Sequence, residues 1–436
     1  MLRTSRELRA VIEALYPFDD KGKLLPLARR CTLLASNANF DLPVQLIGFA
    51  MASAVGEGSP QIVQISYTAA DQTGGHPKKL PPIEGVQRST ATRPAAVGAE
   101  RAALMLQWCT DDYNADLLWM SLDHYTSPKF SVDKYAKPRG CGGMYAPVAK
   151  ALLEDAVDCA GLKVSKEEFA AYANYLTGDE FGEYARDFFG SVSMGKPAWA
   201  MVDTGDTPAA VNLASTKWII DNVRTALDMN DMIIEAEFSA TGSSGQEEEY
   251  AYWPGKDAPK GAATMSDREI EEFMKRITTF VKTTNADAIA YEVGSKHAAK
   301  AGESFVIDVG KLKAVQTALK ALMGRHIPYA GHGGTGFDWQ PDLIGPVFKR
   351  NINTQHLYAG TMSQVRWVDK YRAGIESRDK DAIGRGRKLA EVHAAAESAI
   401  ELLKGCQSWQ RGPEVRKVLA GLEAKKAEFR DSAAKE

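Results

Sequence analysis

Three of the seven histidines in this 436-residue chain follow short apolar runs, and they are His124, His297 and His332. Apolar runs rich in β-branched residues are typical of buried strands, and the carboxyl ends of parallel strands meet at one rim of a barrel. Three imidazoles with one open position are the usual ligands of a catalytic divalent metal ion such as zinc. Each histidine alone could be an ordinary core or loop residue, but their common placement favours a metal site.

Asp123 directly precedes His124. Neighbouring residues on a strand point to opposite faces, but this rule relaxes at a strand end, so that both side chains can reach the same rim. We therefore interpret Asp123 as a proton-transfer group beside the metal. The alternative is a helix N-cap, which is a common role for Asp after a strand.

Three consecutive carboxylates, at 247–249, occur in the stretch EAEFSATGSSGQEEEY at residues 235–250. This stretch reads as a strand end followed by a flexible loop, and such a loop can carry a catalytic base onto a substrate when it closes. For Glu247 and Glu249 taken individually, a solvated loop carboxylate is the better interpretation.

The stretch GHGGTG at residues 331–336 matches the G-x-G-x-x-G pattern of dinucleotide-binding folds. It lies late in the chain, contains His332 and has no acidic residue about 20 positions further on, so that a dinucleotide site is not favoured. Exposed backbone N–H groups of glycines also bind phosphate. Barrels often place a phosphate site after strands seven and eight, where this stretch and NINT at 351–354 fall. An ordinary tight turn is the remaining alternative.

The elements that must position these residues alternate between short apolar runs and amphipathic stretches of helical period. We expect strands at 31–35, 61–65, 116–122, 199–202, 232–236, 286–291, 327–331 and 347–349, with helices between them at 95–112, 209–228, 267–284 and 311–325. Such alternation implies parallel strands joined by right-handed crossovers. Eight units predict an α/β fold, a closed (β/α)8 TIM barrel with its active site at the carboxyl ends of the strands.

The length exceeds that of a minimal barrel. We expect the barrel to occupy residues 1–361, with a helical insertion at about 151–190, and a C-terminal helical extension at 362–436 to pack on the barrel. The long segment at 67–100 is expected to be functional or mobile. The charge-rich end of the chain is most simply a solvated helix face, with a partner-binding helix as the less favoured alternative.

The composition excludes several classes of protein. Lys and Arg total 53 against 56 Asp and Glu, a net charge of −3 that gives no reason to expect nucleic acid or an anionic membrane as a partner. The five cysteines are scattered and form no C-x-x-C motif, so we expect a reduced, cytoplasmic location. The N-terminus lacks the apolar region of a signal peptide. The sequence also contains no run of about 18 apolar residues, so we expect no membrane-spanning helix.

Five pieces of the sequence, taken in order, resemble the class II, metal-dependent fructose-bisphosphate aldolase family. They are SLDH, EAEFSATGSSGQEEE, GSKHAAK, HGGTG and KRNINT. The resemblance implies that His124, His297 and His332 bind zinc or another divalent metal. It also implies that Glu237 is an alternative ligand when the metal shifts. Some members of the family bind a monovalent cation near the Gly-rich loop as well.

The resemblance also implies the remaining roles in the site. Asp123 would exchange the proton at the hydroxyl of the bond being broken. Glu248, or its neighbour Glu247, would handle the proton on the carbon of dihydroxyacetone phosphate, and Asn351 would hold the enediolate. The residues implied to line the phosphates are Ser66, Gly333, Thr335, Asn353 and Thr354.

The sequence departs from the family pattern in two places: Asn353 stands where many members carry Asp, and Ala298 where Gly is usual. The second-phosphate arginine has two candidates, Arg366 and Arg372. The substrate therefore stays open among fructose, tagatose, sedoheptulose and modified sugar phosphates.

Taken together, these features predict a carbon–carbon lyase of carbohydrate metabolism, of the kind used in glycolysis. It would be a zinc-dependent aldolase that cleaves or forms a ketose (bis)phosphate, with dihydroxyacetone phosphate as the enolate partner. The alternatives are a metal-dependent sugar-phosphate isomerase or epimerase, a lysine-imine aldolase acting through Lys349, and a non-catalytic binding protein of the same fold. The family leads us to expect a homodimer or a higher homo-oligomer.

Overall fold

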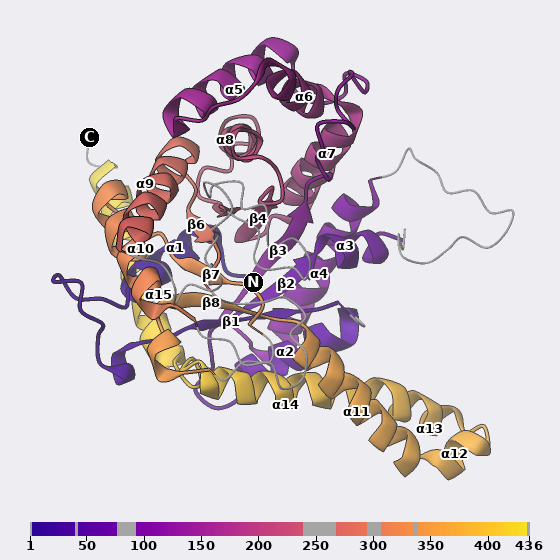
Figure 1. Cartoon of the computed structure of the whole chain (residues 1–436). Coiled ribbons are helices and arrows are strands. Elements are labelled where there is room, and N and C mark those ends of the chain that lie inside the picture. The colour runs from indigo at the N-terminus through magenta and orange to yellow at the C-terminus, as the bar shows by residue number, and fades with distance from the viewer. Residues whose placement is uncertain are drawn as a thin grey trace, which may run out of the picture.

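Eight parallel strands close into a barrel in sequence order, which confirms the predicted TIM barrel (Figure 1). The computed structural model describes residues 2–39, 42–75, 93–238, 267–293, 307–334 and 339–433. The strands are β1 Leu33–Asn37, β2 Gln61–Ser66, β3 Leu118–Thr126, β4 Trp199–Asp203, β5 Ile233–Glu237, β6 Ala288–Ala290, β7 Tyr329–Gly331 and β8 Val347–Ile352. Each of them overlaps or adjoins a run that the sequence predicts.

The helices that surround the barrel are α1 Ser5–Ala14, α2 Leu42–Ala54, α3 Tyr67–Thr73, α4 Pro94–Tyr113, α5 Ala146–Ala160, α6 Lys166–Thr177, α7 Asp179–Gly195, α8 Ala209–Thr225, α9 Asp267–Thr284 and α10 Val309–Met323. After the last strand follow α11 Thr354–Lys370, α12 Arg372–Glu376, α13 Lys380–Gly384, the π-helical turn η4 Arg385–Leu389, α14 Ala390–Gly405 and α15 Gly412–Ala433. Within the described residues, no helix is both long enough and apolar enough to cross a membrane.

The amino end of the barrel is closed by an apolar cluster. Helix α1 begins with a capping box between Thr4 and Glu7, and its buried face packs on the inward side chains of the strands. Trp199 and Phe348 stack in this cluster with 6.5 Å between ring centroids and an interplanar angle of 4°. The floor of the barrel is therefore apolar, and the polar residues lie above it, toward the carboxyl ends.

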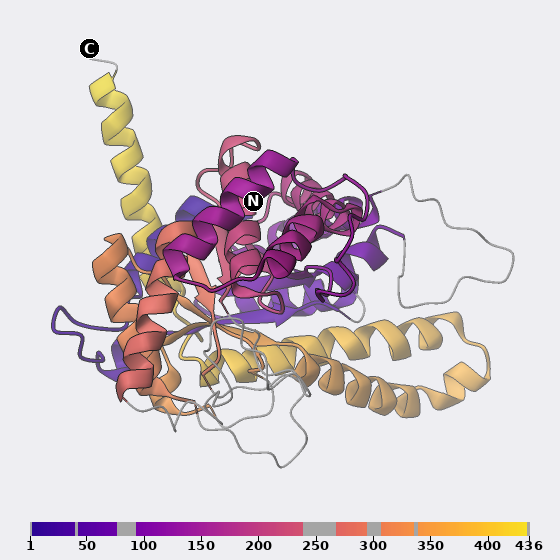
Figure 2. The ribbon, with the colours of Figure 1, turned by 45° about the horizontal axis from the view of Figure 1, so that its top comes forward.

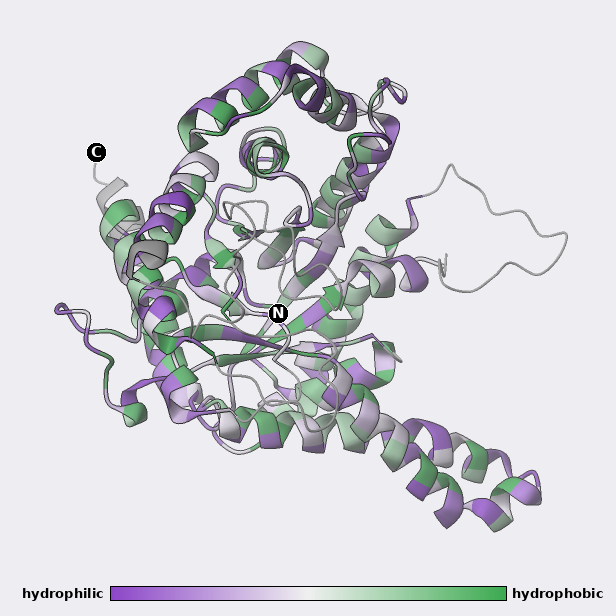
Figure 3. Ribbon diagram, viewed as in Figure 1, coloured by the Kyte–Doolittle hydropathy of each residue, from purple (hydrophilic) through white to green (hydrophobic). Residues whose placement is uncertain are grey.

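Two features extend the barrel. Helices α5 to α7 lie between β3 and β4, and α7 packs against α4 as a barrel helix does. Helices α11 to α14 form a hairpin that projects from the barrel and carries both hydrophobic and hydrophilic residues along its length (Figures 1, 2 and 3). The base of this hairpin is anchored because α14 packs against α2. The exact boundaries between barrel, insertion and extension stay a prediction.

Candidate metal and catalytic site

The end of β3 carries an irregularity that decides how Asp123 and His124 are presented. The pairing of β3 with β2 is regular up to Ser66 and Asp123, but its pairing with β4 shifts register between Leu122 and Tyr125. His124 has a φ of 46°, in the left-handed region that a non-glycine residue adopts at a cost of about 1 kcal/mol or more. This bulge lets two consecutive side chains reach the same rim.

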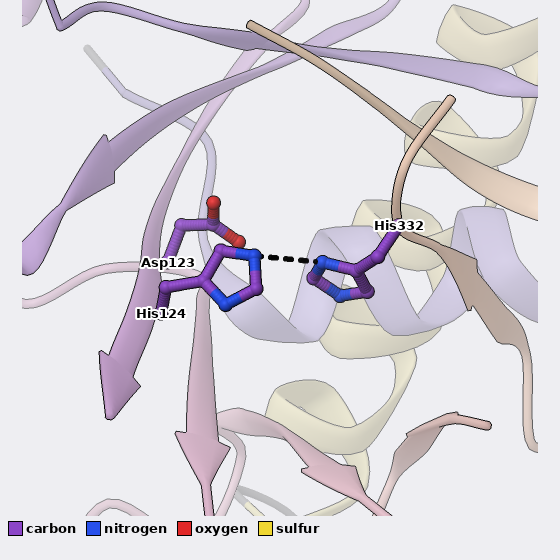
Figure 4. Close-up of side chains that lie close together, drawn as sticks. All are labelled: Asp123, His124 and His332. Atoms are coloured by element: carbon purple, nitrogen blue, oxygen red, sulfur yellow. Dashed lines mark hydrogen bonds between the residues drawn. The ribbon is translucent and has the colours of Figure 1, made fainter. Parts of the chain in front are cut away.

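Asp123, His124 and His332 offer ligand atoms that all lie within 4.8 Å of one another (Figure 4). His124 and His332 come from the ends of β3 and β7, and the Nε2 atom of His124 lies 3.0 Å from the Nδ1 atom of His332. Asp123 and His332 are buried, whereas the side chain of His124 is 32 % exposed. The structure thus brings together three of the residues that the sequence predicts.

Each of the two imidazoles is oriented by a carboxylate. The Nδ1 atom of His124 lies 3.1 Å from Asp203, and the Nε2 atom of His332 lies 2.6 Å from Glu235. An ionised carboxylate only accepts, so these nitrogens donate their N–H and the opposite nitrogens face each other. Carboxylates that fix the tautomer of histidines in this way are typical partners of metal ligands. The donor set therefore fits a divalent metal ion.

The charges around this donor set are strongly coupled. Burial by itself would lower the pKa of His124, but the Asp123 and Asp203 carboxylates raise it to about 9. Burial would raise the pKa of Asp203, but hydrogen bonds with Glu237 and His124 hold it well below its usual range. Without a metal, His124 is therefore a cation whose Nε2 proton points at His332, and a metal ion would replace that proton.

Asp123 is held by amides from the two preceding strands. Its carboxylate accepts from Asn37 Nδ2 at 3.2 Å and from Gln64 Nε2 at 2.8 Å. Asn351, from β8, lies on the other side, with its Nδ2 atom 2.9 Å from His332 Nδ1 and 3.5 Å from Asp123. Asn351 Oδ1 is buried and has no hydrogen-bond partner in the structure as described. This orphaned oxygen lies in the site, beside a group that the sequence predicts to transfer protons.

A buried ion pair lies directly beneath His332. Glu235 and Lys349 are both fully buried, and the Lys349 ammonium lies 2.6 Å from Glu235 Oε2 and 4.0 Å from Asp123 Oδ1. Burial would raise the pKa of Glu235, but Lys349 and His332 hold it well below its usual range. An ammonium paired in this way is a poor nucleophile, which argues against the alternative of a lysine-imine aldolase.

The other predicted site residues take separate positions. The buried Glu237 contacts Asp203 and is not one of the three close donors. Ser66 caps helix α3 and donates to Asn39, while Gly333 has a φ of 65°. Asn353 is the N-cap residue of α11 and Thr354 its first residue, so both lie at the positive end of a helix dipole.

Several predicted residues lie outside the described residues, namely His297, Glu248 with its neighbour Glu247, and Thr335. Their roles stay predictions. The two candidates for the second-phosphate arginine, Arg366 and Arg372, are both exposed and lie on the projecting hairpin, in α11 and α12.

Sequence reasoning gave no role to four residues that shape the site: Asn37, Gln64, Asp203 and Glu235. Each is a polar residue within or at the end of a strand that the sequence predicts. Counting every second residue back from a predicted site residue finds two of them, because Glu235 shares a strand face with Glu237 and Gln64 shares one with Ser66. The others are polar strand residues without a motif.

The fold and the donor set place this chain among TIM barrels with a candidate metal site at the carboxyl rim. The family model Fructose-bisphosphate aldolase class-II matches residues 179–407, more than half of the chain. The chain therefore belongs to the class II fructose-bisphosphate aldolase family, which is a family of carbon–carbon lyases. The matched residues include His332 and Asn351 and leave out Asp123 and His124.

Two solved structures are similar to this chain. A fructose-bisphosphate aldolase from Campylobacter jejuni has a TM-score of 0.53 and 15% identity, over 94% of this chain and 96% of that chain. A protein of Coccidioides immitis assigned as a fructose-1,6-biphosphate aldolase has a TM-score of 0.46 and 13% identity, over 89% of this chain and 95% of that chain. The first likeness supports the barrel fold. Among curated proteins, none matches the sequence of this chain.

Proposed function

We propose that this protein is a zinc-dependent aldolase that cleaves or forms a ketose phosphate, with dihydroxyacetone phosphate as the enolate partner. One observation carries the proposal: the Nε2 atom of His124 lies 3.0 Å from the Nδ1 atom of His332, with the Asp123 carboxylate beside them. A metal ion and a proton-transfer carboxylate at one position are what retro-aldol chemistry requires.

The metal would be held by His124 and His332, together with His297 outside the described residues. Glu237, next to Asp203, would serve as an alternative ligand. When bound, zinc or another divalent ion would stabilise the negative charge that develops on the substrate as the carbon–carbon bond breaks. A monovalent cation near residues 331–336 is part of the same proposal.

The residues of the chain would move the protons. In the cleavage direction, the Asp123 carboxylate accepts the proton of the hydroxyl next to the breaking bond, and the amides of Asn37 and Gln64 hold it in place. Asn351 steadies the enediolate with its amide. Glu248 returns a proton to the carbon of dihydroxyacetone phosphate.

The phosphate groups would bind Ser66, Gly333, Thr335, Asn353 and Thr354. The amino end of α11 supports this proposal, because helix amino ends bind phosphate through free backbone N–H groups.

We also propose a cytoplasmic homo-oligomer, most simply a dimer. All five cysteines lie in the described residues and are free, which suits a reducing compartment. Helix α11 exposes an apolar stripe at Tyr358, Met362, Val365 and Val368, at spacings of four, three and three residues. Such a stripe is typical of an interface with another subunit.

The test is a screen of phosphorylated ketoses with the purified protein, in which released dihydroxyacetone phosphate is detected by a coupled assay. Activity is expected with at least one ketose, to be lost with a chelator and restored by zinc. Chelator-resistant cleavage, or a covalent adduct on borohydride reduction, would contradict the metal mechanism. Interconversion of ketoses without release of triose phosphate would point to an isomerase instead.

A further inference from the structure

We propose that Glu235 and Lys349 act as a positioning pair that holds His332 in the one tautomer able to bind the metal through Nδ1. This inference rests on the proposed function, because it assumes that His332 is a metal ligand. It concerns residues that do not themselves belong to the close donor group of Asp123, His124 and His332.

The two carboxylate oxygens of Glu235 have different partners: one contacts His332, and the other accepts hydrogen bonds from Lys349 and Trp199. Oε1 lies 2.6 Å from His332 Nε2, whereas Oε2 accepts from Lys349 Nζ and from Trp199 Nε1, each at 2.6 Å. The histidine must therefore carry its proton on Nε2, and Nδ1 keeps its lone pair. It is Nδ1 that faces His124 at 3.0 Å.

Lys349 has a distinct part in this arrangement. A carboxylate buried in the barrel interior is costly unless its charge is balanced and its lone pairs are used. The ammonium of Lys349 balances that charge from β8, and its contact with the face of Trp199, 5.0 Å from the ring centroid, fixes it from below. Glu235 can then remain an acceptor for His332 without a proton of its own.

Stability alone does not explain the pair. Replacing a buried ion pair by packed apolar side chains is often neutral or stabilising, and the layer beneath already uses Trp199 and Phe348 in that way. The pair lies between the apolar layer of the barrel interior and the candidate metal site. Glu235 is the member of the pair that hydrogen-bonds to His332, a predicted metal ligand. This placement favours a role in orienting that ligand.

The sharpest test is Glu235→Gln. Because Lys349 and Trp199 both donate to Oε2, the amide oxygen must face them, and the NH2 group must face His332 Nε2. The amide then donates to that nitrogen and drives the histidine proton onto Nδ1. We expect the affinity of the metal-free protein for zinc, measured by competition with a chelator, to fall about 10- to 100-fold. The d–d spectrum of the cobalt-loaded protein should also change.

Lys349 is tested separately, which keeps the proposal falsifiable if Glu235→Gln does not fold. Lys349→Met should weaken zinc binding in the same direction, whereas Lys349→Arg keeps the charge and the donor and should restore most of the affinity. The 15N shifts of histidine-labelled, metal-free protein report the tautomer directly. They should show Nε2 protonation of His332 in the wild type and Nδ1 protonation in Glu235→Gln.

The matched control is Arg224→Met, which removes one of the three arginines that contact the buried Asp287 carboxylate, at 3.0 Å, without touching the predicted metal ligands. It should lower the stability and leave zinc affinity unchanged. Wild-type zinc affinity in Glu235→Gln or in Lys349→Met would overturn the inference, as would an equal loss of affinity in Arg224→Met. If the wild type binds no divalent metal at all, the proposed function itself fails.

Discussion

His124 and His332 are 208 residues apart in the chain, yet the Nε2 atom of the first lies 3.0 Å from the Nδ1 atom of the second. Each ring is turned toward the other by a carboxylate behind it, Asp203 for His124 and Glu235 for His332. Two strands of one closed barrel therefore present a pair of nitrogens at a single point above an apolar floor.

Removal of either histidine is expected to abolish metal-dependent activity. His124→Gln or His332→Gln should lower kcat/KM by about 1,000-fold, which corresponds to about 4 kcal/mol of lost transition-state stabilisation. Bound zinc, measured by elemental analysis after dialysis, should fall in parallel. His393→Gln is the control, because His393 is exposed and stacks on Trp367 in the hairpin. Full zinc content in both site variants would refute the site.

Asp123→Asn separates proton transfer from metal binding. The amide has nearly the same shape but cannot accept a proton, so kcat should fall by about 100- to 10,000-fold while zinc content changes little. The matched control is Asp116→Asn, just before the same strand, where the carboxylate binds Arg416. That variant should keep wild-type kcat. The measurement is kcat from steady-state kinetics on both variants. A wild-type kcat in Asp123→Asn would show that Asp123 is not the proton-transfer group.

Acid should destabilise the protein through two buried histidines. Burial lowers the pKa of His326 and of His356 to about 3, compared with about 6.5 in an unfolded chain. Below pH 6.5 the unfolded state binds protons that the folded state does not. The contribution of these two histidines to the free energy of unfolding is therefore most favourable above that pH and falls as the pH drops toward 3, by about 2 kcal/mol per histidine at pH 5.

His356→Gln tests this pH dependence. His356 packs against Phe49 and neither of its nitrogens has a hydrogen-bond partner within the described structure. In urea unfolding at pH 7 and pH 5, the variant should lose about 2 kcal/mol less stability than the wild type between the two pH values. An equal loss in both proteins would mean that His356 does not contribute.

The apolar stripe of α11 should be part of the subunit interface. Val365→Glu places a charge in the middle of the stripe, and we expect a smaller oligomer by light scattering with the fold retained by circular dichroism. Gln364→Glu adds the same charge at the edge of the stripe but replaces none of its apolar side chains, so it serves as the control and should leave the oligomer intact. A wild-type mass for Val365→Glu would place the interface elsewhere.

Gly48 should be intolerant of a side chain, because it lies where α2 meets α14. A Cβ atom at this position would lie 2.6 Å from the Cβ atom of Ala395 and 2.7 Å from the carbonyl oxygen of Val392. Gly48→Ala should therefore lower the free energy of unfolding by about 1–3 kcal/mol. Gly360→Ala in α11 meets no described atom within 4 Å and should instead add about 0.5–1 kcal/mol from helix propensity. In thermal unfolding, we expect the Tm of Gly48→Ala to fall below that of the wild type and the Tm of Gly360→Ala to rise above it.

The barrel could be predicted from the sequence because strand and helix periodicity are local properties. Eight apolar runs alternate with amphipathic stretches, and parallel pairing with right-handed crossovers leaves little freedom for the topology. The same logic places His124 and His332 at the carboxyl rim, since each follows a strand. The sequence by itself thus determined the fold and the end of the barrel at which the chemistry should occur.

Only the tertiary structure decided how the site is assembled. Alternation along a strand tells which face a side chain takes, but not which side chains meet across the barrel. The register shift after Leu122 turns Asp123 and His124 to one rim. The contact of Glu235 on β5 with Lys349 on β8 spans 114 residues. Such contacts depend on strand register and barrel closure, which no local pattern in the sequence encodes.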